Sequence, residues 1–368
     1  MFDVIIIGGG LSGLNAARLL NIHGKKIALL EQTARLGGLI DTRRTAPKNR
    51  TIDMGGAFVR SKHEYTMSLI KLLNINLSRN PLSKSRDMAD EAPNSIPYKI
   101  SHNEELYHLQ NNGSDLINRL IDNIKGVTVL KKCTVQSFVE HGENTLTKLF
   151  TVHTSRGNYL CKKMVFAIPP KAILKINKSF TQHERVLFTS IEPISLTRIL
   201  IKYNMTDPAN SWLKTISYLG DSSVKVIPIN IGTGFFQITC CDKHFADMWG
   251  KLDTPNTKIQ IKKFLSKHFP NKQIKDPVFF KKKYYEDSLH KWGVNKRTAA
   301  NHQAIIHLRK HLFIIGDSFS FHQGWYEGAI SSSTLVAGII NNQFHETSLG
   351  ENSVSGLSIG TGPNLRYT

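Results

Sequence analysis

Hydrophobic and polar positions at the start of the chain predict a buried strand, a glycine turn, a helix and a second strand. Residues 2–7 are apolar except for Asp3 and are followed by three glycines, which is typical of a strand in a fully covered parallel sheet. Apolar side chains then recur at helical spacing from Leu11 to Ile22, and Gly24 ends the predicted helix. The next apolar run covers residues 26–30. Together these elements have the length of one βαβ unit, about 30 residues.

The rest of the chain predicts two groups of elements with a boundary at Pro169-Pro170, where consecutive prolines interrupt the pattern. Before the boundary, we expect helices at 63–77 and 113–125 and strands within 127–138, 148–153 and 158–168. After it, we expect strands at 190–204, 214–219, 224–229, 234–240 and 311–317, and helices at 256–268 and about 328–342. Residues 80–97 predict a loop, and the Ser-, Gly- and Asn-rich residues 346–368 predict a disordered tail.

Hydropathy and net charge together limit which kinds of membrane association and binding partner we expect. The chain of 368 residues is 40% hydrophobic, and no apolar run reaches the roughly 20 residues that span a bilayer. The apolar opening lacks a basic leading segment, so it predicts a strand and not a secretion signal. With 48 basic and 28 acidic residues, the formal net charge is +20. That field favours an anionic partner such as nucleic acid and disfavours polycationic substrates, although a solvated lysine-rich surface explains it as well.

Cysteine and histidine spacing predicts neither disulfides nor a metal site. Cys133, Cys161, Cys240 and Cys241 form no CxxC pair, so we expect free, buried thiols in a reducing, cytoplasmic compartment. His307 and His311 are four residues apart, but they precede a predicted strand and lack a third ligand.

A glycine motif follows the first predicted strand directly. In Gly8-x-Gly10-x-x-Gly13, the first glycine permits a tight turn, the second lets the backbone approach a diphosphate, and the third lets helix and strand pack closely. The helix N-terminus offers free N–H groups and a partial positive charge to phosphates. Glu31 ends the next strand, where a carboxylate accepts hydrogen bonds from ribose hydroxyls. These features predict a dinucleotide-binding site.

Three further segments carry a family resemblance. After Glu31 come EQTARLGGLIDT and DMGGAFV, and near the other end stands LFIIGDSFSFHQGWYEGAI. In this order, the segments resemble the flavin-containing amine oxidase superfamily, which includes monoamine oxidases, polyamine oxidases, protoporphyrinogen oxidase and phytoene desaturases. The compact, lysine-rich chain is also similar to amine-oxidase-like proteins of large DNA viruses, which would place it in a virion or host cytoplasm. Paired glycines at both positions permit close approach of the backbone to a ligand.

The resemblance implies that FAD binds without a covalent bond. Val135 would contact adenine through its backbone, and the last helix would direct its N-terminal dipole at the flavin. The cofactor-binding residues implied by the resemblance are Gly8, Gly10, Leu11, Ser12, Gly13, Glu31, Gln32, Arg35, Gly37, Gly38, Leu39, Gly55, Gly56, Ala57, Phe58, Val135, Gly316, Asp317, Trp325, Glu327 and Ala329.

On the substrate side, the resemblance places Trp325 as one wall of an aromatic cage, with His290 or Trp292 as candidates for the other wall. Ordinary packing explains Trp325 equally well, and it explains His290 and Trp292 better than a cage does. Arg198 stands where the family has a lysine that holds a water near flavin N5, and arginine cannot be tuned in the same way. Leu39 replaces a frequent arginine, for which Arg43 or Arg44 would compensate.

We therefore expect an α/β fold with an α+β substrate domain, the Rossmann-like two-domain fold of the monoamine oxidase and p-hydroxybenzoate hydroxylase type. The FAD domain would comprise residues 1–79, 106–170 and 286–345, and the substrate domain 80–105 and 171–285. Because the helical insert near 80–105 is short, the substrate cavity would be open or roofed by a second subunit of a homodimer.

The implied reaction is hydride transfer from a carbon next to nitrogen to flavin N5, followed by reoxidation with O2 to H2O2. Two alternatives stay open. One is another flavin oxidase of the protoporphyrinogen oxidase kind. The other is a flavoprotein with a structural role or an anionic partner such as nucleic acid.

Overall fold

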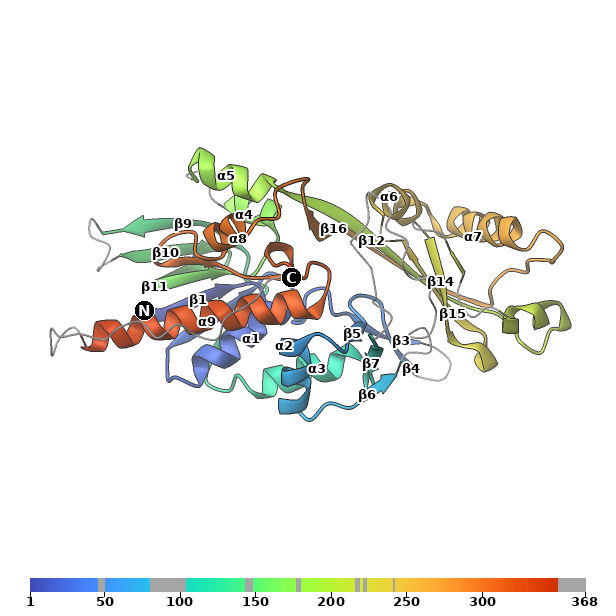
Figure 1. The fold of residues 1–368 in the computed structure, drawn as a ribbon, viewed down its shortest axis with the longest axis horizontal. Helices are drawn as coiled ribbons and strands as arrows, with labels where there is room; N and C mark the ends of the chain where they lie inside the picture. The colour runs from blue at the N-terminus through green and yellow to red at the C-terminus, as the bar shows by residue number, and fades with distance from the viewer. Residues whose placement is uncertain are drawn as a thin grey trace.

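Two β-sheets lie one after the other along the longest axis of the molecule, as the computed structural model shows (Figure 1). The structure describes residues 1–45, 50–79, 104–142, 148–176, 180–215, 219–220, 224–240 and 242–349. The predicted loop at 80–97 and nearly all of the predicted tail lie outside the described residues.

The first sheet is the seven-stranded sheet, which contains the predicted βαβ unit. Its order is β8-β2-β1-β11-β10-β9, with β17 beside β11. The strands are β1 (Phe2–Ile7), β2 (Ile27–Glu31), β8 (Thr128–Lys131), β9 (Val135–His141), β10 (Leu149–Thr154), β11 (Gly157–Phe166) and β17 (Leu312–Ile314). The strands β8, β2, β1, β11 and β17 are parallel, so their carboxyl ends meet at one edge of the sheet. Parallel sheets bind ligands at this edge.

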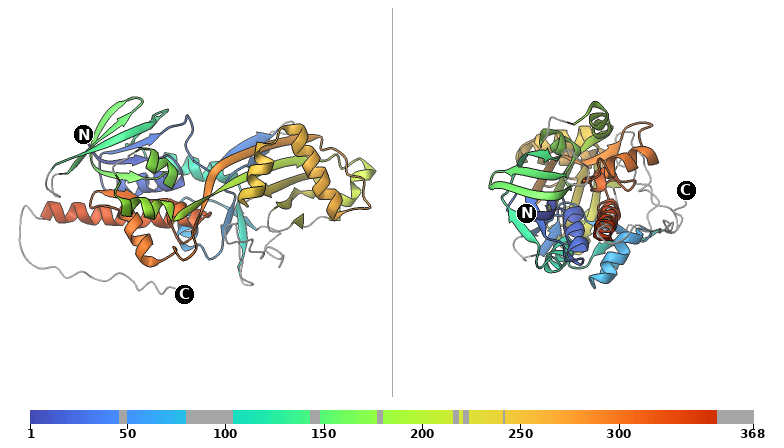
Figure 2. Two further views of the ribbon diagram at one scale, coloured as in Figure 1. Left: turned by 90° about the horizontal axis from the view of Figure 1, so that it is seen from above. Right: turned by 90° about the vertical axis from the view of Figure 1, so that its left-hand side faces the viewer.

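Helices from both ends of the chain cover this sheet. Helix α1 (Leu11–Asn21) packs beside α9 (Tyr326–Leu349), the long red helix of Figures 1 and 2. The buried Asn15 amide donates a hydrogen bond to Ser333 Oγ at 2.9 Å and ties the two helices together. Helix α9 extends beyond the predicted end at 342, because residues 339–349 contain neither Gly nor Pro.

The second sheet is the five-stranded sheet, in which all pairs are antiparallel. Its order is β13-β14-β15-β12-β16, for β13 (Leu219–Gly220), β14 (Val224–Asn230), β15 (Phe235–Cys240), β12 (Ile191–Lys202) and β16 (Phe279–Trp292). Helices α6 (Lys243–Lys251) and α7 (Thr254–His268) cover one face. Because side chains alternate along a strand, Ile199 and Ile201 enter the core below these helices, and Arg198 lies on the opposite face.

Shorter strands and further helices complete the fold. They are β3 (Thr42–Thr45), β4 (Arg50–Asp53), β5 (Phe58–Arg60), α2 (Glu64–Leu72), β6 (Leu77–Arg79), β7 (Leu106–Leu109), α3 (Asn112–Asp122), α4 (Pro170–Ile176), α5 (Gln182–Thr189), α8 (Ala299–Ile306) and the short helices η3 (Pro208–Thr215), η4 (Ile231–Thr233) and η5 (Asp317–Phe319).

Packing divides the chain differently from the expected domain limits. The expected substrate domain begins at 171, but Ile173, Leu187 and Ile191 belong to the large hydrophobic core of the seven-stranded sheet. The expected limit at 286 falls within β16, which pairs with β12 from Trp292 to Phe279. Long strands thus run continuously from one part to the other, and no loop separates them at these positions.

Three of the predicted free thiols are confirmed, since Cys133, Cys161 and Cys240 are buried and unpaired by disulfides. Among the described residues, no group of three His, Cys, Asp or Glu side chains is placed to hold a metal ion. None of the helices in the described part of the chain has both the length and the apolar character needed to cross a bilayer.

Candidate functional site

The glycine motif forms a tight turn between β1 and α1. Gly8 has a φ of +110°, a conformation that side chains rarely adopt, and a Cβ on Gly13 would lie 1.9 Å from the Gly8 carbonyl oxygen. Helix α1 therefore packs directly against the end of β1. Its N-cap is Gly10, and no side chain caps the helix. The first-turn N–H groups face the carboxyl edge of the sheet, where a diphosphate fits.

Glu31 is held in place at the end of β2. One carboxylate oxygen accepts a hydrogen bond from the Gly9 N–H at 2.9 Å, and the other accepts one from the Thr33 N–H at 2.8 Å. These bonds fix the carboxylate beside the glycine turn, where its remaining lone pairs can accept from ribose hydroxyls.

The second glycine pair packs against the first glycine turn. The Gly37 N–H donates to the Gly9 carbonyl at 2.8 Å, and a Cβ on Gly38 would lie 3.0 Å from Gly10 Cα. The Arg35 guanidinium donates to the carbonyls of Gly38 at 2.6 Å and Ile40 at 2.7 Å. Arg35 therefore holds the loop that carries the glycine pair.

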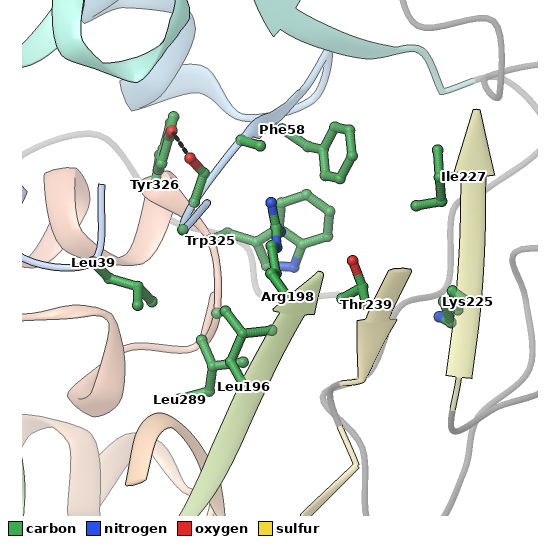
Figure 3. Close-up of a pocket in the computed structure, with 14 residues that line it drawn as sticks. Leu39, Phe58, Leu196, Arg198, Lys225, Ile227, Thr239, Leu289, Trp325 and Tyr326 are labelled. Atoms are coloured by element: carbon green, nitrogen blue, oxygen red, sulfur yellow. Dashed lines mark hydrogen bonds between the residues drawn. The ribbon is translucent and has the colours of Figure 1, made fainter. Parts of the chain in front are cut away.

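The C-terminal motif closes the same site from the other end of the chain. Asp317 is partly buried, and burial raises the pKa of its carboxyl to about 6. The Gly324 N–H donates to this carboxyl at 3.1 Å. The Tyr326 hydroxyl donates to the Gly56 carbonyl at 2.8 Å, which joins segments 270 residues apart (Figure 3).

These segments enclose an elongated cavity, the cofactor cavity, of about 390 Å³. Most of the residues implied by the resemblance line it: Gly8, Gly10, Leu11, Ser12, Glu31, Gln32, Arg35, Gly37, Gly38, Leu39, Gly56, Gly316, Asp317, Trp325 and Ala329. The sequence reasoning missed two further parts of its wall. Residues 167–169 follow β11, whose place beside β1 was not evident from the sequence. Residues 285–288 come from β16, where an irregular pairing with β12 carries no local motif.

Three of the implied cofactor residues line neither this cavity nor the smaller one described below. Gly13 serves the packing of α1 on β1, and Val135 begins β9, where it pairs with Thr154. Glu327 faces α2 instead. Its carboxylate accepts hydrogen bonds from the Tyr65 N–H at 3.1 Å, the Thr66 N–H at 2.8 Å and the Thr66 hydroxyl at 2.7 Å. Successive residues point in different directions on a helix, so Ala329 reaches the cavity and Glu327 does not.

A second, smaller cavity of about 90 Å³ adjoins the first and is called the substrate cavity here (Figure 3). It lies between residues 55–58 and the face of the five-stranded sheet that α6 and α7 do not cover. Five residues line both cavities: Leu39, Gly56, Gly324, Trp325 and Tyr326. The other residues lining the substrate cavity are Gly55, Ala57, Phe58, Leu196, Arg198, Lys225, Ile227, Thr239 and Leu289.

Trp325 reaches the substrate cavity as expected, and the side chains of His63 and Arg60 pack against its ring. The His63 ring meets it edge-on with the centroids 5.2 Å apart, and the Arg60 guanidinium lies 5.1 Å from its centroid. Burial lowers the pKa of His63 to about 3, so this histidine is a neutral packing partner at physiological pH.

The two other expected cage residues do not line either cavity. His290 Nδ1 lies 2.9 Å from Ser318 Oγ, and burial lowers the pKa of His290 to about 4. Trp292 Nε1 donates to the Ser320 carbonyl at 3.1 Å. Both side chains tie β16 to the loop after β17. The neighbouring Leu289 takes the place at the cavity, because adjacent residues on a strand face opposite sides.

Arg198 projects into the substrate cavity from β12 (Figure 3). It is 7% exposed, donates to the Asp53 carbonyl at 3.5 Å, and lies 6.0 Å from the Phe58 ring centroid. Leu39 lines both cavities, whereas Arg43 lies outside them and pairs with Asp41 at 2.7 Å.

Comparisons with known proteins agree with this geometry. Residues 6–73 match the NAD(P)-binding Rossmann-like domain family. (S)-6-hydroxynicotine oxidase of Paenarthrobacter nicotinovorans is 49% identical over 65 residues, which are 17% of this chain and 15% of that enzyme. Flavin-containing amine oxidase A of Bos taurus is 34% identical over 108 residues, 29% of this chain and 16% of that protein. The sequence matches thus span about one sixth of these relatives.

The fold comparison extends over nearly the whole chain. Cyclohexylamine oxidase from Brevibacterium oxydans IH-35A superposes with a TM-score of 0.72 at 16% identity, covering 94% of this chain and 99% of that one. A protein assigned as a protoporphyrinogen oxidase from Exiguobacterium sp. 255-15 gives 0.70 at 11% identity, covering 93% and 99%. The predicted fold class and the predicted resemblance are confirmed: the N-terminal segment is related in sequence, and the chain in fold, to this group of flavoproteins.

Proposed function

We propose that this chain, a flavoprotein of the flavin-containing amine oxidase superfamily, is an FAD-dependent oxidoreductase that oxidises a carbon–nitrogen bond. One observation carries the proposal: a glycine-lined dinucleotide cavity shares a wall with a separate, mainly apolar cavity that contains Trp325. A reactive ring bound at the shared wall would meet a substrate there. One sequence relative is named as a flavin-containing amine oxidase and another as a hydroxynicotine oxidase, and both names support this reaction class.

The residues of the cofactor cavity fit FAD. The N-terminus of α1 would hold the diphosphate, and Glu31 would accept hydrogen bonds from a ribose. A polyol chain would pass Asp317, whose carboxyl lines the cavity and can accept hydrogen bonds from its hydroxyl groups. Bound FAD supplies the acceptor for a hydride and passes the electrons to O2, which becomes H2O2.

The substrate cavity would position and desolvate the reacting group. Trp325 and Phe58 present aromatic surfaces, and Leu196 and Leu289 exclude water. The residues that line this cavity include no Asp, Glu or His, so no carboxylate or imidazole base faces the substrate from the described residues. A substrate that enters as the neutral amine needs no such base for the hydride step: it would lose a hydride to the flavin and become an iminium ion, which water would hydrolyse to a carbonyl compound and an amine or ammonia.

Anaerobic reduction tests this proposal. The purified holoprotein would be mixed without O2 with a panel of primary, secondary and cyclic amines while the visible flavin spectrum is followed. We expect at least one amine to bleach the flavin, and O2 to restore the colour with one H2O2 per substrate oxidised. If no amine reduces a flavin that dithionite reduces readily, amine oxidation is wrong.

A second candidate function is a flavoprotein that binds an anionic partner and turns over slowly or not at all. Arg198 favours it, because a guanidinium cannot replace a lysine whose charge is adjustable. The net charge of +20 favours it as well. Salt-sensitive binding of nucleic acid, measured by fluorescence anisotropy on protein whose flavin no substrate bleaches, would support this alternative. Leu39, which stands in place of a frequent arginine, favours a reaction of the protoporphyrinogen oxidase kind. The substrates tested by anaerobic reduction should therefore include a reduced tetrapyrrole.

A further inference from the structure

The short strand β5 contributes Phe58 to the substrate cavity and a second side chain to the support of Trp325. Side chains alternate along a strand, so Phe58 and Arg60 project from one face of β5 and Val59 projects from the other. Val59 is buried in the core of the seven-stranded sheet, whereas Phe58 lines the substrate cavity (Figure 3). The Arg60 guanidinium lies 5.1 Å from the centroid of the Trp325 ring. One strand therefore supplies one aromatic side chain of the cavity and contacts another.

Arg60 is fixed by a carboxylate that is itself held in place. Its guanidinium donates two hydrogen bonds to Glu104, one of them from Nε to Oε1 at 2.5 Å. The side chains of Glu104 and Arg60 are 2% and 18% exposed. The next residue, Glu105, exchanges two hydrogen bonds with Ser61, at 2.8 and 2.9 Å, and these fix the backbone beside the pair. A planar guanidinium bound at two points has little rotational freedom, so it keeps one position against the Trp325 ring.

The turn after β5 brings a second side chain onto the same ring. The His63 N–H donates to the Arg60 carbonyl at 3.1 Å, which closes this turn. The His63 ring then meets the Trp325 ring edge-on, with the two planes at 75°. Burial lowers the pKa of His63 to about 3, so the ring is neutral at physiological pH. Trp325 is thus contacted by two side chains of one turn, of which Arg60 is the one held by a salt bridge.

The backbone of Trp325 leaves the orientation of its ring to such side-chain contacts. Trp325 directly precedes α9, and its N–H donates to the His322 carbonyl at 3.4 Å. These constraints place the Cα atom, but two side-chain torsions still decide where the ring points. The contacts with Arg60 and His63 restrict both torsions. A cavity wall orients a substrate well only if the wall itself keeps one orientation.

We propose that Arg60, bound by Glu104, is a positioning residue that holds the Trp325 ring in the orientation in which the ring receives the substrate. Arg60 lines neither cavity, so it acts through Trp325 and does not itself contact the substrate. The inference rests on the proposed function for its effect on turnover, whereas the restraint on the ring requires no reaction. It assigns the support of the cavity wall to two residues that stand 44 positions apart in the sequence.

The chain offers a matched control, because a second pair of the same kind lies outside both cavities. The Arg309 guanidinium donates two hydrogen bonds to Glu184, at 2.7 and 2.8 Å, and lies 5.9 Å from the centroid of the Phe180 ring. None of these three residues lines the cofactor cavity or the substrate cavity. Removal of this pair therefore measures the general cost of losing an arginine that is bound to a glutamate and packed on an aromatic ring.

A double-mutant cycle on the holoprotein tests the inference. Arg60→Met is made together with Glu104→Gln, so that no uncompensated buried carboxylate remains, and Arg60→Lys is the conservative variant that keeps the charge. Each is also combined with Trp325→Ala. Arg309→Met together with Glu184→Gln is the control.

Three measurements are made on each protein. The indole N–H resonance of Trp325, assigned by its absence in Trp325→Ala, reports the order of the ring without any ligand. Titration with 2-phenylpropan-2-amine, followed in the flavin spectrum, reports binding, because an amine without hydrogen on the carbon next to nitrogen is not oxidised. The anaerobic rate of flavin reduction by the most reactive amine of the panel reports turnover.

We expect Arg60→Met with Glu104→Gln to broaden or double the Trp325 resonance and to lower binding and flavin reduction roughly 3- to 30-fold, and no further than Trp325→Ala does. In the Trp325→Ala background the same change should alter either quantity less than about twofold, because two residues that act through one ring are not additive. Arg60→Lys should have a smaller effect. The control at Arg309 should stay within about twofold of the wild type. Flavin content and thermal unfolding identify a variant that fails to fold, in which case Arg60→Lys provides the test.

The outcomes separate the inference from the proposed function. If the Trp325 resonance stays single and narrow without the Arg60 pair, or if the effects of losing Arg60 and Trp325 simply multiply, the positioning role is overturned. Amines that reduce the flavin in that case leave the proposed function standing. If the resonance changes as expected but no amine reduces the flavin, Arg60 positions the ring and amine oxidation is wrong. An equal effect of the Arg309 control would show a general loss of stability and would also overturn the positioning role.

Discussion

The cofactor cavity and the substrate cavity adjoin, yet different parts of the chain build them. Backbone from glycine turns forms most of the cofactor cavity, and close packing of Gly13, Gly38 and Gly56 on their neighbours leaves no room for side chains. Side chains from β12, β14, β15 and β16 form the substrate cavity. The shape of the cofactor cavity is therefore set by the positions of glycines in the chain. The lining of the substrate cavity is set by the pairing of strands from distant parts of the sequence.

The largest expected effect is a loss of FAD affinity caused by a substitution in the cofactor cavity alone. In Gly8→Ala, a Cβ would lie 2.4 Å from the Ala167 carbonyl oxygen, at a φ of +110°. We expect FAD affinity to fall more than about 100-fold, because strain of a few kcal/mol must be relieved by moving the diphosphate turn. Gly338→Ala in α9 is the matched control, since a Cβ there meets nothing within 4 Å. Titration of apoprotein with FAD measures both. Equal affinities would contradict the assigned turn.

The second prediction concerns how the stability of the apoprotein depends on pH through Asp317 in the cofactor cavity. The folded protein raises the pKa of Asp317 from 3.8 to about 6 by burial. Between these values the folded state binds more protons than the unfolded state, so stability falls as pH rises from about 4 to about 6 and is constant above. In the apoprotein, Asp317→Asn should lack this loss, which is on the order of 3 kcal/mol. Urea unfolding of both proteins at pH 4 and pH 7 measures the difference. A pH-independent difference between them would contradict it.

A smaller effect tests the correction for Glu327. Its carboxylate caps α2 through the Tyr65 and Thr66 N–H groups and does not face the cofactor cavity. Glu327→Gln should therefore lower the free energy of unfolding by about 1 to 3 kcal/mol, because hydrogen bonds to a charged acceptor are lost. Flavin content should remain one per chain. Loss of FAD with unchanged unfolding would show instead that Glu327 binds the cofactor.

The smallest effect concerns the substrate side. Trp325→Ala should lower kcat/KM for the best amine about 3- to 30-fold, as expected for loss of one aromatic surface. His290→Ala removes a side chain that ties β16 to Ser318 and should change kcat/KM less at equal flavin content. Steady-state kinetics on both variants rank the two residues. A larger loss of kcat/KM in His290→Ala than in Trp325→Ala would show instead that His290 contacts the substrate.

The comparison also explains what the sequence could predict. Gly8, Glu31 and Gly38 stand in short local motifs, and the N-terminal βαβ unit follows from a hydrophobic pattern within about 30 residues. These features can be recognised in a single chain because neighbours in sequence make the site. The order of the motifs at the two ends also allowed their meeting at Gly56 and Tyr326 to be predicted in outline.

The substrate side could not be predicted in the same way. Lys225, Thr239 and Arg198 line the substrate cavity together only because three strands are paired in register, and no local spacing fixes that register. A shift of one residue decides whether Leu289 or His290 reaches the cavity. Likewise, Glu327 and Ala329 stand in one motif, but helix geometry directs them to different neighbours.

Stoichiometric binding of FAD tests the central claim most directly. Purified protein would be stripped of cofactor and titrated with FAD, and separately with NAD⁺, while ligand fluorescence and protein unfolding are followed. The account predicts that one FAD binds per chain, raises the unfolding temperature and leaves no covalently attached flavin after denaturation. A protein that remains colourless after reconstitution, or that binds NAD⁺ in preference to FAD, would contradict it.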